Sequence, residues 1–202
     1  MNSVPINLFD LVLVGTLVGG LLRGRKQGMS EELLGLLKWI TVVTACAFAY
    51  EPLGQAFANA NNVFSLLSCY LMAYVAIALV VLVLFALLKR SLGGKLLGSD
   101  IFGRAEYYLG MGSGLVRFSC ILVACLALLH ARSYSSAEIR AMENFQNREF
   151  GSNYFPTLHT IQATVFEKSF FGPWIQDNLG FLLIKRTAPE RKQLQQQEFT
   201  LP

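Results

Sequence analysis

The sequence predicts an all-α integral membrane protein, a bundle of four transmembrane helices with a short amphipathic or irregular extracytoplasmic C-terminal segment. Charged residues make up 15% of the 202 positions and hydrophobic residues 53%, whereas a typical soluble domain is about 25% charged. Residues 52–88 contain no Asp, Glu, Lys or Arg. The first 130 residues contain four apolar runs, each near the roughly 20 residues that a helix needs to cross a bilayer.

The transmembrane domain is expected at residues 1–130, with spans at about 4–22, 33–50, 66–88 and 111–129. Lipid offers the backbone no hydrogen-bond partner, so each run has to be helical. The first run contains Asp10 and ends at a basic cluster, and the second contains Lys38 and ends before Pro52, because proline commonly ends a helix. The third run is uninterrupted, and the fourth contains Arg117 near its start.

The rest of the chain is more polar. Residues 91–109, which join the third and fourth spans, fit an interfacial helix or a plain loop. Residues 131–184 form the extracytoplasmic segment, with a short amphipathic helix over 135–150. Charges and a Gly-Pro pair interrupt residues 155–184 too often for a fifth span, so one or two helices packed on the outer membrane surface are expected there. The charged, Gln-rich tail at 185–202 is expected to be disordered.

Basic residues alternate between the short connections and so predict the orientation. Three Lys or Arg follow the first run and four follow the third, whereas none precedes the first or follows the second before the third begins. Short cytoplasmic loops are enriched in these residues. Both basic connections are therefore expected in the cytoplasm, with the N-terminus and the C-terminal segment outside, which is the periplasm in a bacterium with two membranes.

No catalytic, cofactor-binding or metal-ligating residue is predicted. No Ser-His-Asp set, HExxH or GxSxG motif occurs, and His130 and His159 have no Cys or carboxylate at ligand spacing. All the cysteines lie in apolar stretches without a CxxC pair, which favours a packing role: Cys46, Cys69, Cys120 and Cys125. The expected partners are the lipid bilayer and either a second copy or other membrane proteins, not nucleic acid.

Three ionisable residues lie inside predicted spans: Asp10, Lys38 and Arg117. Such residues are costly in lipid and usually face a bundle interior, a partner or water. Lys38 and Arg117 either extend to the cytoplasmic headgroups or pair with Asp10. Such a pair would have to bridge about 10 Å of membrane depth. Asp10 has a short side chain, so a packing role and a functional role are equally open for it.

Glycines at four-residue spacing predict a close helix crossing. Gly24 and Gly28 lie one turn apart at the end of the first run, and Gly110 and Gly114 do the same at the start of the fourth. Small residues at this spacing let membrane helices approach closely. We expect the first and fourth spans to cross there, although packing between two copies would use the same pattern. Gly112 lies about half a turn off this face.

Five of these positions form an ungapped pattern, Asp-x13-Gly-x3-Gly-x3-Glu-x6-Trp, that resembles the first helical hairpin of the colicin V production protein family. Its members here are Asp10, Gly24, Gly28, Glu32 and Trp39. The run Leu109-Gly110-x3-Gly114-Leu115-x-Arg117 resembles the family's second signature, and Ser169-x3-Pro173 its C-terminal element. The resemblance covers about residues 7–130, with that C-terminal element as a weaker extension. Tyr107 and Phe118 depart from the family pattern, and residues 131–166 look like an insertion.

The resemblance implies a non-enzymatic bacterial inner-membrane protein that supports colicin V-type toxin production or export and envelope homeostasis. It also implies an extracytoplasmic C-terminus, because some relatives use this hairpin pair to anchor a periplasmic protease. The alternative is a small channel or transporter with a polar path through Asp10, Lys38 and Arg117. A transporter needs polar side chains around one cavity near the midplane, whereas a scaffold turns apolar side chains inward. A membrane-embedded enzyme is the least favoured hypothesis.

Overall fold

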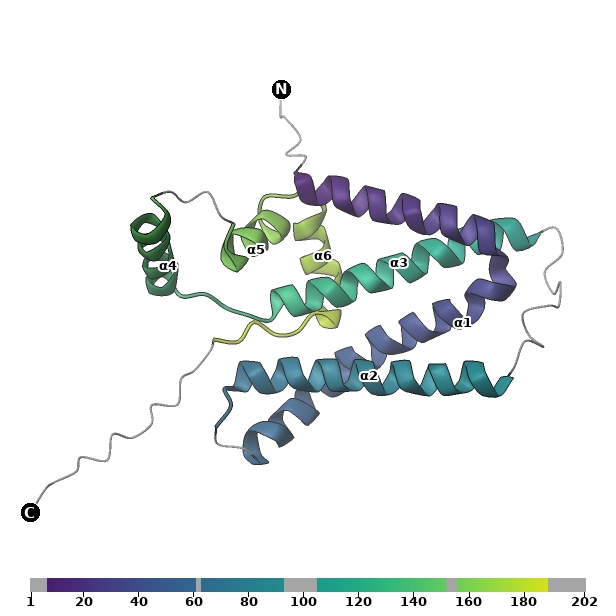
Figure 1. Cartoon of the computed structure of the whole chain (residues 1–202), viewed down its shortest axis with the longest axis horizontal. Coiled ribbons are helices and arrows are strands. Elements are labelled where there is room, and N and C mark those ends of the chain that lie inside the picture. The colour runs from purple at the N-terminus through teal and green to yellow at the C-terminus, as the bar shows by residue number, and fades with distance from the viewer. Residues whose placement is uncertain (1–6, 61–62, 93–104, 152–155, 189–202) are drawn as a thin grey trace, which may run out of the picture.

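The computed structural model describes residues 7–60, 63–92, 105–151 and 156–188, and these are almost entirely helical (Figure 1). The elements are α1 Leu8–Ala60, α2 Leu66–Leu92, α3 Glu106–His130, α4 Ser136–Phe150, α5 Leu158–Phe166, α6 Phe171–Leu179 and the 3-10 turn η3 Gly180–Leu182. Within these ranges there is no strand, and the one β-type contact is a bridge between Arg132 and Thr187. The all-helical prediction is therefore confirmed.

Helix α1 bends sharply at Gly28, which has φ 74° and ψ 169°. A positive φ of this size favours glycine, because other side chains rarely adopt it. The bend divides α1 into a first arm, residues 8–27, and a second arm, residues 29–60. These arms correspond to the first two predicted spans, and the basic residues expected to connect them continue the first helix instead. Lys, Arg and Gln are good helix formers, which explains this continuation.

The second arm does not end at Pro52 as predicted but continues to Ala60. The added turns pack against α2, where Gly54 lies so close to the ring of Tyr70 that a side chain at position 54 would collide with it. Tyr50 also packs edge-on against Tyr70, with ring centroids 5.7 Å apart. Packing against α2 therefore stabilises the helical turns after Pro52, although proline usually ends a helix.

Among the described residues, three helical stretches are long and apolar enough to cross a membrane: Glu32–Ala60, Leu66–Ser91 and Glu106–His130. Their outward faces carry many exposed leucines and valines, including Leu79, Val83, Leu84 and Leu87 on α2. Contiguous apolar surface of this kind marks contact with lipid or with another protein. The protein is therefore a membrane protein. The first arm lies alongside α3 (Figure 1), but its charges keep it out of this set of three.

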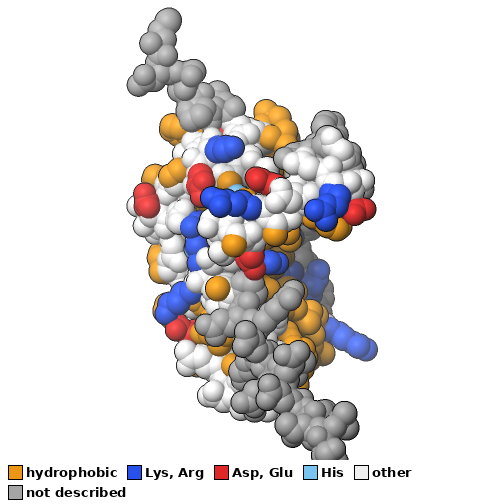
Figure 2. All heavy atoms as spheres, turned by 90° about the vertical axis from the view of Figure 1, so that its left-hand side faces the viewer, with side chains coloured by type: hydrophobic (Ala, Val, Ile, Leu, Met, Phe, Trp, Pro, Cys, Tyr) orange, Lys and Arg blue, Asp and Glu red, His pale blue; other side chains and the backbone are white. Residues whose placement is uncertain are grey.

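The C-terminal segment folds into short helices that close one end of the bundle. Helix α4 begins after a capping box between Ser135 and Glu138 and ends at Phe150, followed by Gly151, which has φ 65°. This matches the amphipathic helix predicted over 135–150. Two helices, α5 and α6, occupy the region where one or two were predicted. Charged side chains of both signs gather on this end of the molecule (Figure 2).

The same segment contributes to the main core instead of lying only on a surface. Phe166 and Ile184 are almost completely buried, in one cluster with Tyr50, Tyr74 and Leu126. Residues 185–188, predicted to begin a disordered tail, make defined contacts because the backbone of Thr187 bonds to Ala131 and Ser133. The rest of the predicted tail, and residues 93–104 of the predicted interfacial helix or loop, lie outside the described residues.

Candidate functional site

The first arm and α3 cross through glycines with their backbones almost in contact. A methyl group added to Gly24 would collide with the carbonyl oxygen of Gly110, and one added to Gly114 would collide with that of Gly20. A methyl group on Gly110 would lie 2.5 Å from the oxygen of Gly24. We call these four residues the glycine crossing. Gly112, by contrast, has nothing within 4 Å, so the predicted face and the predicted helix pair are both confirmed in position.

The bend at Gly28 is closed by the start of α3. Glu106 accepts a hydrogen bond from the backbone N–H of Ser30 at 3.4 Å, and a methyl group on Gly28 would lie 2.9 Å from the same Oε1. The N–H groups at the start of a helix have no partner within it, and a carboxylate satisfies them well. Glu106 therefore joins the beginning of the second arm to the beginning of α3.

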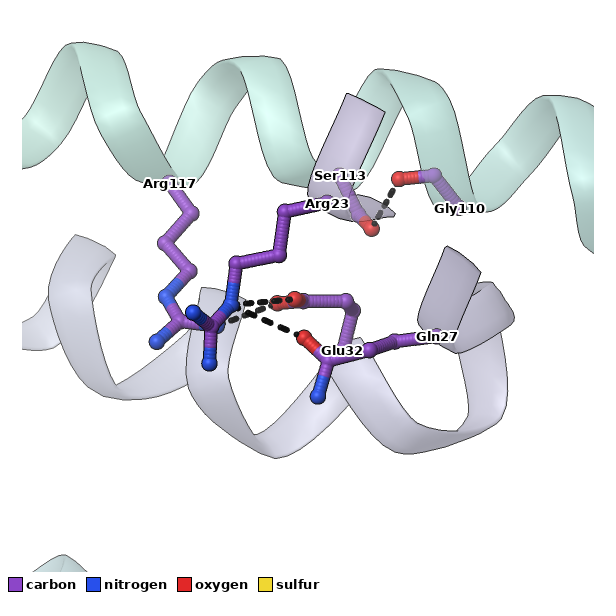
Figure 3. Close-up of polar contacts among 6 residues, drawn as sticks. All are labelled: Arg23, Gln27, Glu32, Gly110, Ser113 and Arg117. Carbon is purple, nitrogen blue, oxygen red and sulfur yellow. Dashed lines mark hydrogen bonds and ion pairs between the residues drawn. The ribbon is translucent and has the colours of Figure 1, made fainter. Parts of the chain in front are cut away.

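A buried ion pair lies next to the glycine crossing (Figure 3). Glu32, whose side chain is 1% exposed, accepts a hydrogen bond from Arg117 Nη1 at 2.6 Å. Arg23 Nε lies 4.0 Å from the other carboxylate oxygen of Glu32 and donates to Gln27 at 3.1 Å. The partner of Arg117 is therefore Glu32, in the second arm, and not Asp10 of the first arm. A buried carboxylate needs such a partner, because an unpaired charge there is strongly destabilising.

A pocket of about 310 Å³ opens beside this ion pair, between the two arms, α2 and α3. Four cationic side chains line it: Arg23, Lys38, Lys89 and Arg117. Apolar side chains of the second arm and α2 form much of the remaining wall, together with Gln27 and Gly35. Lys38, which pairs with no acid among the described residues, lies with its Nζ 5.8 Å from the ring centroid of Trp39. The cations of the first arm, α2 and α3 thus converge on one cavity.

Asp10 lies at the opposite end of the first arm and binds backbone N–H groups instead of a cation. Its carboxylate accepts hydrogen bonds from the backbone N–H groups of Asn7 at 3.0 Å, Phe170 at 3.1 Å and Phe171 at 3.2 Å. In the described structure it pairs with neither Lys38 nor Arg117. Asp10 therefore holds the first turn of α6, and the pairing considered from the sequence is not formed.

The Ser169–Pro173 element is the start of that same helix. Ser169 Oγ accepts a hydrogen bond from the N–H of Gly172 at 2.8 Å and donates to Val165. Gly172 has no room for a side chain against the carbonyl oxygen of Val165. Pro173 occupies the first turn of α6, where its missing N–H is not needed. The element therefore shapes the tight turn from α5 into α6 and presents its N–H groups to Asp10.

We expect Asp10→Ala to loosen the contact between the first arm and α6, because up to three backbone N–H groups lose their acceptor. Losing a helix-capping carboxylate costs about 1–2 kcal/mol, measurable as a lower melting temperature of the purified protein. Adding Lys38→Leu should give an additive effect, because the two residues do not touch. Asp177→Ala, at the exposed far end of α6, is the matched control and should change little. Rescue by Lys38→Leu would contradict this assignment.

A second set of polar contacts attaches the end of the described chain. His130 Nδ1 lies 2.9 Å from the carbonyl oxygen of Ile184, and Arg186 Nε donates to His130 Nε2 at 3.2 Å. These bonds require a neutral imidazole with its proton on Nδ1. Lys185 forms an exposed ion pair with Glu51 at 2.8 Å, and this bond raises the pKa of the Lys185 ammonium. Within the described ranges, no three His, Cys, Asp or Glu side chains gather as a metal site.

The fold and the buried contacts define a class: a helical integral membrane protein whose helices are locked by a glycine crossing and an internal ion pair. The sequence matches the family described as Colicin V production protein over residues 9–177. This range covers most of the chain, so the protein belongs to that family. It includes Glu32, Arg117, the glycine crossing and the Ser169–Pro173 turn. No curated protein and no solved structure gave a significant match.

Proposed function

We propose that this protein is a non-enzymatic component of the bacterial inner membrane that supports production or export of colicin V-type toxins and envelope homeostasis. Membership of the colicin V production family supports the link to toxin production. The exposed apolar faces support a role within the bilayer, through self-association or through other membrane proteins.

The observation that carries the proposal is the apolar interior of the bundle. Its core consists of aliphatic, Cys and aromatic side chains from all the long helices and from the C-terminal segment. Two of the buried polar side chains form hydrogen bonds within the protein. Asp10 binds the start of α6, and Ser113 donates to the carbonyl oxygen of Gly110 at 2.9 Å. An interior used for packing favours a structural component.

The cationic pocket is the observation that favours the alternative, a channel or transporter. It brings Lys38 and Arg117 to one cavity, as that hypothesis requires. Asp10, however, lies at the other end of the first arm and does not line this cavity. A polar path through all three residues is therefore less well supported than the structural role.

We further propose that the first arm is a fourth membrane crossing. Its 20 residues would extend about 30 Å as a helix, which matches the hydrocarbon thickness of a bilayer. Figure 1 places the bend of α1, the end of α2 and the start of α3 at one end, and the described C-terminal helices at the other. Basic residues lie in the last turns of the first arm and of α2, at the former end, which supports a cytoplasmic location for it.

Cysteine accessibility tests this topology in a background without the four native cysteines. Engineered cysteines at Asn61 and Asn153 should react with an impermeant thiol reagent added outside the inner membrane. A cysteine at Gln27 should react only after the membrane is permeabilised. The reverse pattern would exclude the proposed orientation, and labelling of Asn61 and Gln27 from the same side would exclude a second-arm crossing.

Deletion and complementation test the function in a strain that makes a colicin V-type toxin. Loss of the gene should reduce secreted toxin and raise detergent sensitivity, and the full-length chain should restore both. Crosslinking in native membranes should then capture a second copy or another membrane protein. Unchanged toxin secretion and detergent resistance would contradict the proposal. Solute flux in proteoliposomes containing the protein alone would favour the transporter instead.

A further inference from the structure

The cationic pocket differs from the other polar sites because its charges are not balanced inside the protein. Four cations line it, and the carboxylate beside it, that of Glu32, is already bonded to Arg117. Among the described residues, Lys38 and Lys89 have no acidic partner within ion-pair distance. The cavity therefore has an excess of positive charge.

Such an excess calls for an anion from outside the protein. Like charges held close together repel one another, and a bound anion relieves this repulsion. The Nε atom of Arg117 is also buried and has no hydrogen-bond partner among the described residues. Arginine and lysine together are suited to a phosphate group, to which guanidinium offers paired donors and ammonium a compact charge.

The other wall of the pocket indicates what carries the phosphate. This apolar wall is formed by Leu34, Leu82, Phe85 and Ala86. Next to it, the exposed Leu84, Leu87 and Leu88 of α2 continue an apolar surface along the helix. A ligand that touches both walls has a charged end and an apolar end. The pocket also lies near the ends of α2 and of the first arm, which is the depth of a lipid headgroup if these helices cross the bilayer.

We propose that this pocket binds the phosphate group of an anionic phospholipid, with the acyl chains lying along α2. Lys38 and Lys89 hold the phosphate from the second arm and α2, while Arg117 contributes through its side not bonded to Glu32. Basic pockets between transmembrane helices are established as sites for anionic headgroups. The bound lipid fills the gap between α2 and the crossing of the first arm with α3, and so joins two parts of the bundle. The proposal does not depend on a role in toxin production.

Lipid titration of the purified full-length protein in a neutral detergent tests this site. Native mass spectrometry would measure binding of short-chain phosphatidylglycerol, with short-chain phosphatidylcholine and inorganic phosphate as separate arms. Phosphatidylglycerol should bind most tightly and should also raise the melting temperature, because a ligand of the folded state stabilises it. Equal affinity for phosphatidylcholine would overturn the electrostatic basis. Binding of inorganic phosphate at the same concentration would overturn the assignment to a lipid.

Charge-removing variants locate the binding to this pocket. Lys38→Gln and Lys89→Gln should each weaken phosphatidylglycerol binding about fivefold, and the double variant about 25-fold, following the contribution of one cation near an anionic lipid. Arg90→Gln is the matched control, since Arg90 is the neighbouring exposed cation on α2 and does not line the pocket. Both lysines lie outside the core cluster, so these variants should fold, and their melting temperature without lipid verifies this. An equal loss with Arg90→Gln would show general surface attraction and overturn the site.

Discussion

Replacing Glu32 by Leu should be among the most damaging single changes in this protein. The substitution leaves the Arg117 guanidinium without its 2.6 Å partner. Removing one member of a buried ion pair typically costs about 3–5 kcal/mol. The lower end applies here, because Arg117 is 20% exposed and water screens part of its charge. The measurement is the melting temperature of the detergent-solubilised protein, together with its amount in the membrane.

A double-mutant cycle distinguishes the loss of this pair from a general packing defect. Glu32→Leu combined with Arg117→Leu should recover much of the lost stability, because neither charge is then left alone in an apolar environment. The two single effects should therefore be strongly non-additive. Additive losses would show that the contact between Glu32 and Arg117 does not contribute to stability. Gln27→Leu serves as a control of similar size, because Gln27 lies beside the pair and accepts its hydrogen bond from Arg23 instead of from Arg117.

Gly114→Leu should destabilise the protein by about 3 kcal/mol, the upper end of the usual cost of enlarging a side chain in a packed interior. The upper end is expected because the new side chain would meet the backbone of the first arm, which cannot rotate away. Gly114→Ala should have a smaller effect in the same direction. The melting temperature of each purified variant checks the order.

Gly112→Leu is the matched control, two residues along the same helix. Nothing lies within 4 Å of the position where its side chain would begin. Replacing a helical glycine also removes a local cost of about 1 kcal/mol. This variant should therefore be neutral or more stable than the natural protein. Equal destabilisation by Leu at positions 112 and 114 would show that the glycine crossing is not an interface.

The sequence predicts the helices and one of their contacts because both leave periodic or compositional signals. Apolar runs of span length indicate the long helices directly. The four-residue spacing of Gly110 and Gly114 identifies the packing face of the fourth span. The same spacing of Gly24 and Gly28 identifies the first span as the helix that packs against it. The structure confirms this crossing in position. Gly28 lies on the predicted face as well, since a methyl group on Gly110 would lie 2.9 Å from its Cα, and its positive φ also forms the bend.

The polar contacts were harder to predict, because the partners are chosen by tertiary structure. The sequence suggests Asp10 as a partner for Arg117, but the structure pairs Arg117 with Glu32. The family pattern contains Glu32 and gives no indication of which residue it pairs with. Asp10 bonds to backbone N–H groups of Phe170 and Phe171, and backbone donors leave no trace in the sequence. The continuation of α1 past Pro52 likewise depends on packing against Tyr70.

The contact between Asp10 and α6 has a consequence for how the protein is made. The residues that satisfy this carboxylate lie 160 and 161 positions later in the chain. At a synthesis rate of about 5–20 residues per second, roughly 8–30 s pass before they emerge. Throughout that interval the Asp10 carboxylate has only the local N–H of Asn7 as a partner and lacks the two donors from the start of α6. Docking of α6 on the first arm is therefore a late step, timed by the translation of the C-terminal segment, and in a chain truncated before α6 the Asp10 carboxylate would lack two of its three hydrogen bonds.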